Sequence, residues 1–417
     1  MRRFSPRTSG VLLPWTGVAL LLVAACRDTP RVAPEADTGP LVSDSTGLHV
    51  VNDTAPSWGT ASPWTVADAP TLDIGDPEQP LLGVPAVVRL SDGRIVVANG
   101  STQTIMYFDA SGKLLTTAGG RGVDPGQFHG MGWIGRAAGD SVVAYDFVAR
   151  RLALFDAKGK FVRTADLKPA DPTVAVEPLG TYPDGSVLFR LGRAQNPFPG
   201  KPGTVLRDSA SYLRFALDGL PVASVGRFPQ GETFGVRVRP KEALAPFPVP
   251  FGLVTVAALR GDTTLIGTGA SFEIASFGAE GAPIGLLRAA IPRSPVTPQD
   301  AKDFTAAAIT RLKTGTRTLN TSLDSNLVRS LEKAPFPVLK PAFSHLLVDR
   351  TGALWVLTPA AANVWTVFAP DGTWLGTVTT PEGLRVDEIG PDYVLGVWRQ
   401  RHGQERVRSY PLTRGSL

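Results

Sequence analysis

The chain has 417 residues, with 42 lysines and arginines against 37 aspartates and glutamates. Residues 1–25 contain three arginines and no acid, so the rest of the chain has a balance of 39 minus 37, or +2, and no nucleic-acid partner is expected. One cysteine and three methionines are too few for a thiolate or Met/Cys metal site, whereas 44 glycines and 37 prolines indicate many turns.

The first 26 residues have the features of an export signal. Three arginines precede an apolar run, VALLLVAA at residues 18–25, which is shorter than the ~20 residues of a membrane-spanning helix. The run ends in VAAC at residues 23–26, which resembles the lipobox of bacterial lipoproteins. That resemblance implies a signal peptide over residues 1–25 and a lipid on Cys26 that anchors the protein to a membrane. An ordinary signal peptide with a chance cysteine is the alternative.

Arg27 follows the cysteine, whereas an aspartate at that position usually retains lipoproteins of Gram-negative bacteria in the inner membrane. The resemblance therefore favours the outer membrane. Residues 26–56 are rich in Pro, Asp, Thr and Ser and lack apolar periodicity, so we expect a flexible tether there. Residues 57–417 are then left for the folded part.

A turn-and-strand phrase recurs along the rest of the chain, and internal repeats decide the fold class. It reads FDASGK at residues 108–113 and FDAKGK at residues 155–160, with looser copies at residues 215–219, 277–281 and 368–372. A second phrase, a short turn before a strongly β-prone strand, precedes each copy. Its six turns lie at residues 91–93, 138–140, 183–185, 260–262, 350–352 and 390–392.

Each repeat therefore predicts four antiparallel strands, A to D, which is the pattern of a β-propeller blade. The six units span roughly residues 84–119, 132–167, 175–227, 253–291, 342–379 and 384–412. The last unit lacks a fourth strand, and we expect residues 70–75 to complete it and so to close the ring. The predicted fold class is all-β, a six-bladed β-propeller with a small helical insertion. A pair of β-sandwiches and an open solenoid are the alternatives.

Residues 119–128, GGRGVDPGQF, resemble the link between blades in NHL-repeat propellers, Gly-x-Gly-x-x-Pro-Gly-x-Phe. The match covers the first two units well and is looser over the other four, which lack the link. The chain is thus similar to the NHL-repeat-like six-bladed propeller lipoproteins of bacteria, most of which have no assigned activity. The resemblance implies an architecture and leaves the function open.

The long insertions fall in one class of connection. In a propeller the A–B and C–D turns lie on one face, and the other connections lie on the opposite face. Here the A–B and C–D turns are short, and the insertions at residues 191–210, 228–252 and 292–341 all belong to the other class. Long insertions are uncommon unless they bind or cover something, so this insertion-bearing face is predicted to be the functional one.

The third insertion predicts two helices, over residues 298–313 and 322–333. Thr297 is a good N-cap, Pro298 suits the first helical position and Asp300 places an acid in the first turn. The two helices could form a lid over the insertion-bearing face, or a strut that packs on the rim.

The B strands end on the same face. Arginine binds two oxygens of a carboxylate, sulfate or phosphate at once, and tryptophan stacks on flat groups, so a basic and aromatic mouth suits an acidic glycan or a peptide carboxylate. The candidate ligand-binding residues are Asn99, His129, Trp133, Asp146, Arg190, Arg193, Arg237, Arg239 and Arg399. The alternative for each arginine is a solvated side chain or an ion pair with a nearby acid such as Glu232.

No catalytic constellation stands out, because both the Gly-x-Ser-x-Gly elbow and the dinucleotide-binding glycine motif are missing. The four histidines are dispersed, and His345 lies in an apolar strand, which predicts a place in the core. Some six-bladed propellers are calcium-dependent enzymes with acidic ligands near the starts of the A strands, where this chain offers only Glu177 and Asp387. No catalytic residue, metal site or cofactor is therefore expected.

The favoured function is a binding or scaffold propeller at the cell envelope, which recognises a glycan, a peptide or a partner protein through its insertion-bearing face. A metal-dependent hydrolase or lyase with its site in the propeller channel is the alternative. A purely structural envelope component, whose insertions contact another subunit, is the third possibility.

Overall fold

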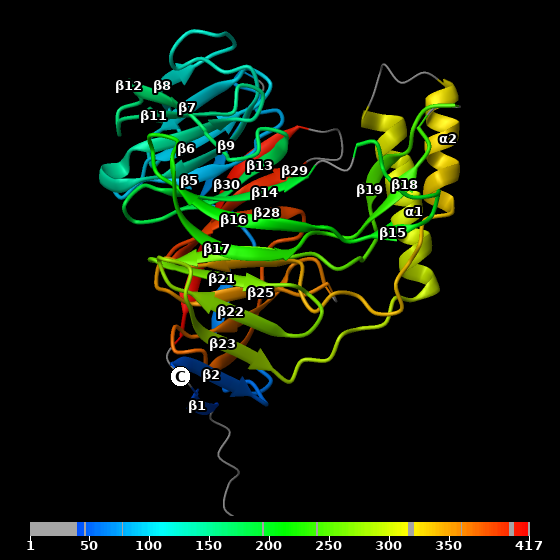
Figure 1. Ribbon diagram of the computed structural model, residues 1–417. Helices are drawn as coiled ribbons and strands as arrows, with labels where there is room; N and C mark the ends of the chain where they lie inside the picture. The colour runs from blue at the N-terminus through cyan, green and yellow to red at the C-terminus, as the bar shows by residue number, and fades with distance from the viewer. Residues whose placement is uncertain are drawn as a thin grey trace, which may run out of the picture. The chain divides into compact units, whose positions relative to one another are not determined.

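The computed structural model describes residues 40–415 except 46, 77, 194–195, 239–240, 316–320, 360 and 400–403. The predicted signal peptide, Cys26 and Arg239 therefore lie outside the described residues. Thr38–Leu417 form one compact unit. Its described part consists mostly of β-strands in several sheets, together with two α-helices (Figure 1).

Four of the sheets contain four antiparallel strands each, and each sheet corresponds to one unit of the repeat. The first sheet contains β5 (Val87–Arg89), β6 (Ile95–Asn99), β7 (Thr104–Phe108) and β8 (Leu114–Gly119). The second contains β9 (Met131–Arg136), β10 (Val142–Asp146), β11 (Arg151–Phe155) and β12 (Phe161–Asp166). The third contains β13 (Val174–Thr181), β14 (Val187–Arg193), β16 (Ser209–Phe215) and β17 (Pro221–Pro229). The fifth unit contains β24 (His345–Val348), β25 (Leu354–Leu357), β26 (Val364–Phe368) and β27 (Trp374–Thr379).

The sheet of the fourth unit is wider than expected. It contains β20 (Val256–Arg260), β21 (Thr263–Gly267), β22 (Glu273–Phe277) and β23 (Pro283–Ala289), and it continues through β2 (Leu48–Asp53) and β1 (Leu41–Ser45). The strand β2 runs parallel to β23, Val50 and Val51 are buried, and the Asp53 carboxylate accepts the backbone N–H of Trp374 at 2.8 Å. The expected tether over residues 26–56 is therefore wrong for residues 41–53, because a strand some 230 residues later in the chain provides their hydrogen-bonding edge.

The sheet of the last unit takes strands from both ends of the described chain. It contains β28 (Leu384–Ile389), β29 (Tyr393–Arg399) and β30 (Glu405–Arg414), and both β4 (Leu72–Ile74) and β3 (Trp64–Val66) pair with β30. Ile74 lies opposite Val407, and Trp64 lies opposite Arg414 further along the same strand. The segment at residues 70–75 thus pairs with the last unit, as the repeat pattern predicted.

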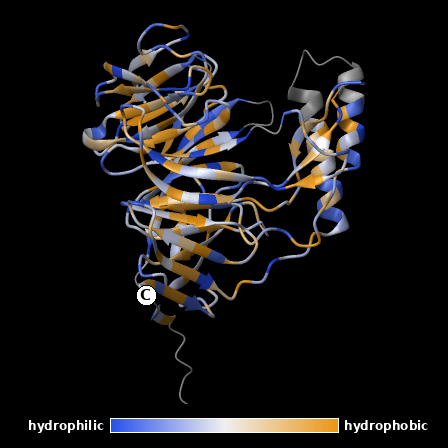
Figure 2. Ribbon diagram, viewed as in Figure 1, coloured by the Kyte–Doolittle hydropathy of each residue, from blue (hydrophilic) through white to orange (hydrophobic). Residues whose placement is uncertain are grey.

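Apolar cores lie between successive sheets, and Figure 2 shows apolar residues along their strands. A further core packs Leu395 and Val397 of the last sheet against Val87 and Val97 of the first. The first strand of each sheet contacts the first strand of the next, and β28 also contacts β5. Several four-stranded antiparallel sheets that pack together in this way are consistent with a β-propeller.

The repeated Asp-Gly phrase folds into a tight turn between the third and fourth strands. The Asp109 carboxylate accepts the backbone N–H of Ser111 and of Lys113, each at 2.9 Å. Gly112 has a φ angle of 90°, which a residue with a Cβ atom rarely adopts. Asp156 makes the same contacts in the next unit, to Lys158 and Lys160. These contacts explain why the Asp-Gly spacing recurs in the sequence.

The three insertions come together in one insertion body beside the sheets (Figure 1). This body contains β15 (Val205–Leu206), β18 (Thr233–Val236), β19 (Ala245–Pro248), α1 (Pro298–Gly315) and α2 (Thr321–Glu332). The three strands form a separate small sheet, and Phe234 and Val236 pack against Leu327 and Leu331 of α2. Both helices predicted for the third insertion are therefore found, and they share a core with the second insertion.

The helix α1 begins at the predicted residue because its start is capped from both sides. The Thr297 hydroxyl accepts the backbone N–H of Asp300 at 3.1 Å, and the Asp300 carboxylate accepts the backbone N–H of Thr297 at 2.8 Å. The Lys340 ammonium lies 2.8 Å from the same carboxylate. The Lys340 contact and the Thr297 hydrogen bonds lower the pKa of Asp300 to about 2. None of the described helices has the length and apolar character needed to cross a membrane.

Candidate functional site

Two cavities lie among the first strands of the sheets. The turn-side cavity, of about 1130 Å³, is lined by the ends of these strands and by the turns that follow them. The insertion-side cavity, of about 680 Å³, is lined mainly by the beginnings of the same strands. Val174, at the start of β13, pairs with Arg193, where the first insertion leaves β14, so this second cavity lies on the insertion-bearing face.

The two cavities share six lining residues, one on or next to the first strand of each unit. This waist consists of Pro85, Trp133, Leu179, Leu259, Val348 and Asp387. Four of the six side chains are aliphatic or proline. The waist is therefore a mainly apolar ring between the polar groups of the turn-side cavity and those of the insertion-side cavity. Trp133 and Asp387 are its two residues with polar atoms.

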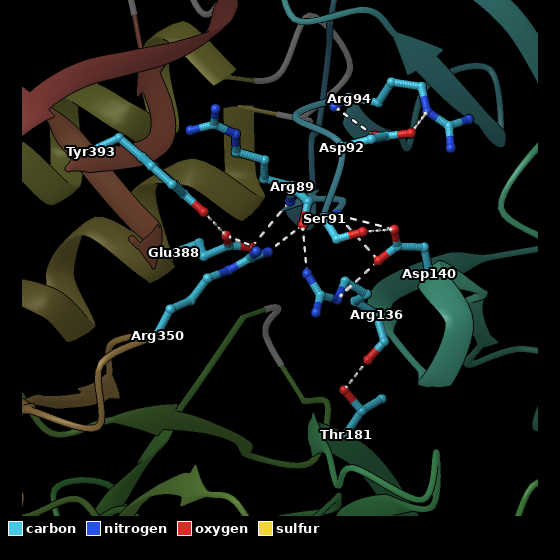
Figure 3. A network of polar contacts seen from close by, with 10 residues as sticks. All are labelled: Arg89, Ser91, Asp92, Arg94, Arg136, Asp140, Thr181, Arg350, Glu388 and Tyr393. Carbon is cyan, nitrogen blue, oxygen red and sulfur yellow. Dashed lines mark hydrogen bonds and ion pairs between the residues drawn. The ribbon is translucent and has the colours of Figure 1, made fainter. Parts of the chain in front are cut away.

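The charged groups near the turn-side cavity are bonded to one another (Figure 3). Glu388 forms an ion pair with Arg350 at 2.7 Å, and it accepts the backbone N–H of Arg89 at 3.1 Å and the hydroxyl of Tyr393. The Arg350 guanidinium also donates to the backbone oxygen of Arg89. Burial, together with the Glu388 charge, raises the pKa of Tyr393, so its phenol keeps the proton that it donates.

The same network continues into the second and third sheets (Figure 3). The Arg136 guanidinium donates to the backbone oxygen of Arg89 at 3.4 Å and lies 3.4 Å from the Asp140 carboxylate. That carboxylate accepts the backbone N–H of Ser91 at 3.0 Å, and the Thr181 hydroxyl donates to the backbone oxygen of Arg136 at 2.6 Å. The network joins the turns of five units, so its contacts hold neighbouring sheets together.

Two ion pairs dominate the insertion-side cavity. The Arg190 guanidinium on β14 contacts the Glu177 carboxylate on β13. The Arg385 guanidinium contacts the Asp387 carboxylate through two atom pairs, Nη2–Oδ1 at 2.9 Å and Nε–Oδ2 at 3.2 Å. Arg385 also donates to the backbone oxygen of Val84 at 3.0 Å. Each arginine is therefore neutralised by its own carboxylate.

Two groups in this cavity have shifted proton affinities. Burial raises the pKa of Asp387 to about 6, although the Arg385 charge opposes the shift. His345 is exposed to the cavity, yet protein surrounds it on most sides, and this burial together with the Arg385 charge lowers the pKa of its imidazole. The imidazole is consequently neutral at pH 7, and the Asp387 carboxyl exchanges its proton in mildly acidic solution. Asp387 is therefore a group that can bind or release a proton near neutral pH.

Two buried hydroxyl groups belong to residues of the same cavity wall. Thr255, just before β20, is 2% exposed, and its hydroxyl has no hydrogen-bond partner among the described residues. Tyr212 on β16 is fully buried, and its burial raises the pKa of the phenol against the opposing charge of Arg190. A buried hydroxyl without a partner costs about 1–3 kcal/mol, so Thr255 is a polar group of the cavity wall whose hydrogen bond is not satisfied by the described residues.

The Trp133 ring reaches over Gly135 of its own strand. A Cβ atom at Gly135 would be 2.3 Å from the Trp133 ring, so only glycine at that position lets the indole take this place. The indole is partly exposed and lines both cavities. Trp133 thus presents a flat aromatic surface at the waist.

The structure reassigns two of the candidate residues. Asn99 and Asp146, at the ends of β6 and β10, are 2% and 0% exposed. Asp146 accepts the backbone N–H groups of His129, Gly130, Val148 and Ala149, and Asn99 donates to the backbone oxygen of Pro80. Their prediction as ligand-binding residues needs correction. An Asn or Asp at the end of a strand can form hydrogen bonds with the backbone groups of the loop that follows or faces it, and these two residues do so.

The other candidates are dispersed. Trp133 and Arg190 line the insertion-side cavity. The Arg237 guanidinium donates to the backbone oxygen of Glu242 at 2.6 Å, and Arg399 forms an ion pair with buried Glu405 at 2.7 Å. His129 and Arg193 are exposed and line neither cavity.

Sequence reasoning missed three residues of the cavity. It placed His345 in the core, whereas the side chain is exposed to the cavity, and it did not select Thr255 or Arg385. The available signal was position, because all three lie at the beginning of a first strand. Within the described ranges, no three His, Cys, Asp or Glu side chains come together as a metal site.

The comparisons with known proteins find likeness in structure only. No family model matches the chain, and no curated protein matches it in sequence. An exported protein of Bacteroides fragilis is 10% identical, with a TM-score of 0.46, over 88% of this chain and all of that one. Virginiamycin B lyase of Staphylococcus aureus is 11% identical, with a TM-score of 0.41, over 84% of this chain and 99% of the lyase. Regucalcin of Agrobacterium tumefaciens is 12% identical, with a TM-score of 0.39, over 84% of this chain and 98% of regucalcin. Likeness at this level transfers no activity, substrate or partner to this chain.

Proposed function

We propose that this chain is an exported, lipid-anchored binding protein, built on a closed six-bladed β-propeller, that takes its ligand into the insertion-side cavity. The ligand is a glycan, a peptide or an exposed segment of a partner protein. The observation that carries the proposal is the hydroxyl of Thr255, buried and without a partner in the wall of that cavity. A polar ligand would satisfy it.

Closure of the propeller is supported by contacts between the last unit and the first. The buried Glu405 carboxylate on β30 accepts the backbone N–H of Val84 at 2.5 Å, and Arg385 on β28 donates to the backbone oxygen of the same residue. The pairing of β4 with β30 adds an early strand to the last sheet. In this arrangement the two cavities are the two ends of one central channel.

Export and membrane attachment are supported by the sequence alone. The apolar run and the VAAC motif predict cleavage before Cys26 and acylation of its thiol, and each buried CH₂ group of a lipid contributes about 0.8 kcal/mol to membrane binding. Arg27 favours the outer membrane. Residues 27–40 would then connect the lipid to the first strand of the folded unit, which is a shorter tether than the sequence predicted.

The insertion-side cavity is a better ligand site than the larger turn-side cavity. The charged groups of the turn-side network bond to one another and hold sheets together, and the buried Nε of Arg260 is the one atom of that wall found without a hydrogen-bond partner among the described residues. In the insertion-side cavity, the buried hydroxyl of Thr255 has no hydrogen-bond partner among the described residues, and the His345 imidazole lies nearby in the same wall. The first insertion, which belongs to the insertion body, also leaves β14 on this face.

The test is retention of a ligand, whether a glycan, a peptide or a protein, by the full chain in mild detergent. The protein is mixed with an extract of bacterial envelopes, separated from free solutes and analysed by mass spectrometry. The variant Glu177→Gln/Arg190→Gln removes both charges of one cavity ion pair. The matched control, Asp92→Asn/Arg94→Gln, removes an ion pair of 2.7 Å that lines neither cavity.

We expect a compound that the wild type and the control retain and the cavity variant loses. Equal retention by all three proteins, or no retained compound at all, would contradict the proposal. The same experiment addresses the alternative of a hydrolase or lyase, which the Asp387 carboxyl with its pKa of about 6 favours. A binding protein returns its ligand unchanged, whereas an enzyme returns a product of different mass.

A further inference from the structure

We infer that the ligand of the insertion-side cavity is an uncharged, hydroxyl-rich ring, which is the chemistry of a neutral glycan residue. This inference rests on the binding function proposed above and narrows its ligand class. It replaces the acidic glycan or peptide carboxylate that the arginines in the sequence suggested. Three properties of the cavity carry it: its charge balance, its aromatic surface and its free hydrogen-bonding groups.

The charges of the cavity cancel. Arg190 is paired with Glu177, and Arg385 is paired with Asp387 through two atom pairs. An anionic ligand would have to displace a carboxylate from its arginine or lie beside that carboxylate without compensation, and both cost free energy in a partly buried site. His345 adds no positive charge at pH 7, because its pKa is lowered. A ligand without net charge avoids these costs.

The aromatic surface is the indole of Trp133 at the waist. Gly135 lets this ring reach over β9, and the partly exposed side chain lines the cavity. The C–H groups on one face of a pyranose ring pack on such a flat surface, while the hydroxyls point outward around the edge. The cavity volume of about 680 Å³ lies within the range of about 300–1,000 Å³ that small-molecule sites have.

The hydrogen-bonding groups of the cavity match hydroxyls. A threonine hydroxyl and a neutral imidazole each offer one donor and at least one acceptor, which is also what a sugar hydroxyl offers. Thr255 and His345 are such groups in the cavity wall, and the buried Thr255 hydroxyl has no hydrogen-bond partner among the described residues. The carboxylates of Glu177 and Asp387 are already bonded to Arg190 and Arg385. The groups left in the cavity wall are therefore neutral ones that suit a hydroxyl.

The test compares trisaccharides that differ in charge. The full chain in mild detergent is titrated with neutral cellotriose and triacetylchitotriose, acidic trigalacturonate and basic chitotriose, and binding is followed by calorimetry. Trp133→Ala removes the aromatic surface, and Thr255→Val removes only the hydroxyl. Trp398→Ala is the control, since this partly buried indole lines neither cavity.

We expect a neutral trisaccharide to bind more tightly than its charged counterparts. Trp133→Ala should weaken this binding about tenfold or more and Thr255→Val about threefold to tenfold, with no change in the control. If Trp133→Ala does not fold, the test relies on the change in trisaccharide affinity of the isosteric Thr255→Val variant. Tighter binding of the acidic or basic sugar at the same residues would overturn the neutral class and leave the binding function in place. Failure of every trisaccharide to bind would overturn this inference, while the retention experiment above still decides the binding function.

Discussion

The guanidinium of Arg385 and the carboxylate of Asp387, two residues apart on β28, face each other through two atom pairs at 2.9 and 3.2 Å. Both side chains line the insertion-side cavity, and Asp387 lies at a β-bulge where the register of β28 against β29 shifts. Burial nevertheless raises the pKa of Asp387 to about 6, above the value of about 3.9 for an unfolded chain.

This shift predicts how stability depends on pH. Between pH 4 and pH 6 the folded protein binds a proton at Asp387 that the unfolded chain releases, so the contribution of this group to stability falls as pH rises through that window. The Asp387→Asn variant should lose this fall. The measurement is the free energy of unfolding of both proteins at pH 4 and pH 7. Other titrating groups act equally in both proteins, so identical pH dependence would contradict the assignment.

The contact between the last unit and the first depends on Glu405. Its carboxylate is 4% exposed, accepts the N–H of Val84 at 2.5 Å and pairs with Arg399 at 2.7 Å. Glu405→Ala leaves a buried N–H without a partner and should lower the free energy of unfolding by about 1–3 kcal/mol.

The control for Glu405 is Glu273→Ala. Glu273 also pairs with an arginine, Arg288 at 2.8 Å, but both side chains are more than 40% exposed. This variant should cost about 1 kcal/mol or less. Denaturant titration measures the free energy of unfolding of both variants. Equal losses of stability would argue against a structural role of the contact between the last unit and the first.

The hairpin of β1 and β2 predicts the boundary of the folded unit. A chain that begins at residue 57 loses the buried side chains of Val50 and Val51 and leaves the N–H of Trp374 without Asp53. We expect it to be less stable than a chain that begins at residue 40 by about 3 kcal/mol or more. Thermal unfolding of the two chains is the measurement. Equal midpoints would mean that the tether predicted through residue 56 is correct in solution.

The capping box at the start of α1 predicts a local effect. Thr297→Ala removes the hydroxyl that accepts the N–H of Asp300 and should destabilise the helix by about 1 kcal/mol. Hydrogen exchange of the first-turn amides should become about fivefold faster. Thr305→Ala, in the middle of the same helix, is the control and should leave exchange unchanged or slower, since alanine favours helix.

Much of the local structure was predictable from the sequence. The Asp-Gly phrase marks a turn because the Asp109 carboxylate accepts backbone N–H groups of the turn and Gly112 adopts its positive φ angle. The strands on either side carry the apolar residues that the cores require. The start of α1 at Pro298 was predictable for the same reason, since the cap lies within four residues.

The cavity was only partly predictable. Trp133 and Arg190 were selected from position on a strand, but the ion pair of Arg190 with Glu177 joins neighbouring strands and depends on their register. Asn99 and Asp146 have the same residue types as many ligand-binding sites, yet they are buried by their own loops. Residue type alone does not say whether a polar side chain faces a cavity or its own backbone.

The sequence by itself determined the repeated strands, their turns, the strand that pairs with the last unit and the two helices of the third insertion. These features depend on contacts within a few residues, or on a pattern that repeats, and both can be read along the chain. Only the tertiary structure decided that β2 joins β23, that the second and third insertions share one core and that Thr255, His345 and Arg385 line one cavity. These relationships join residues that are far apart in the chain. Packing among the sheets brings these residues together, and a local sequence pattern does not contain that information.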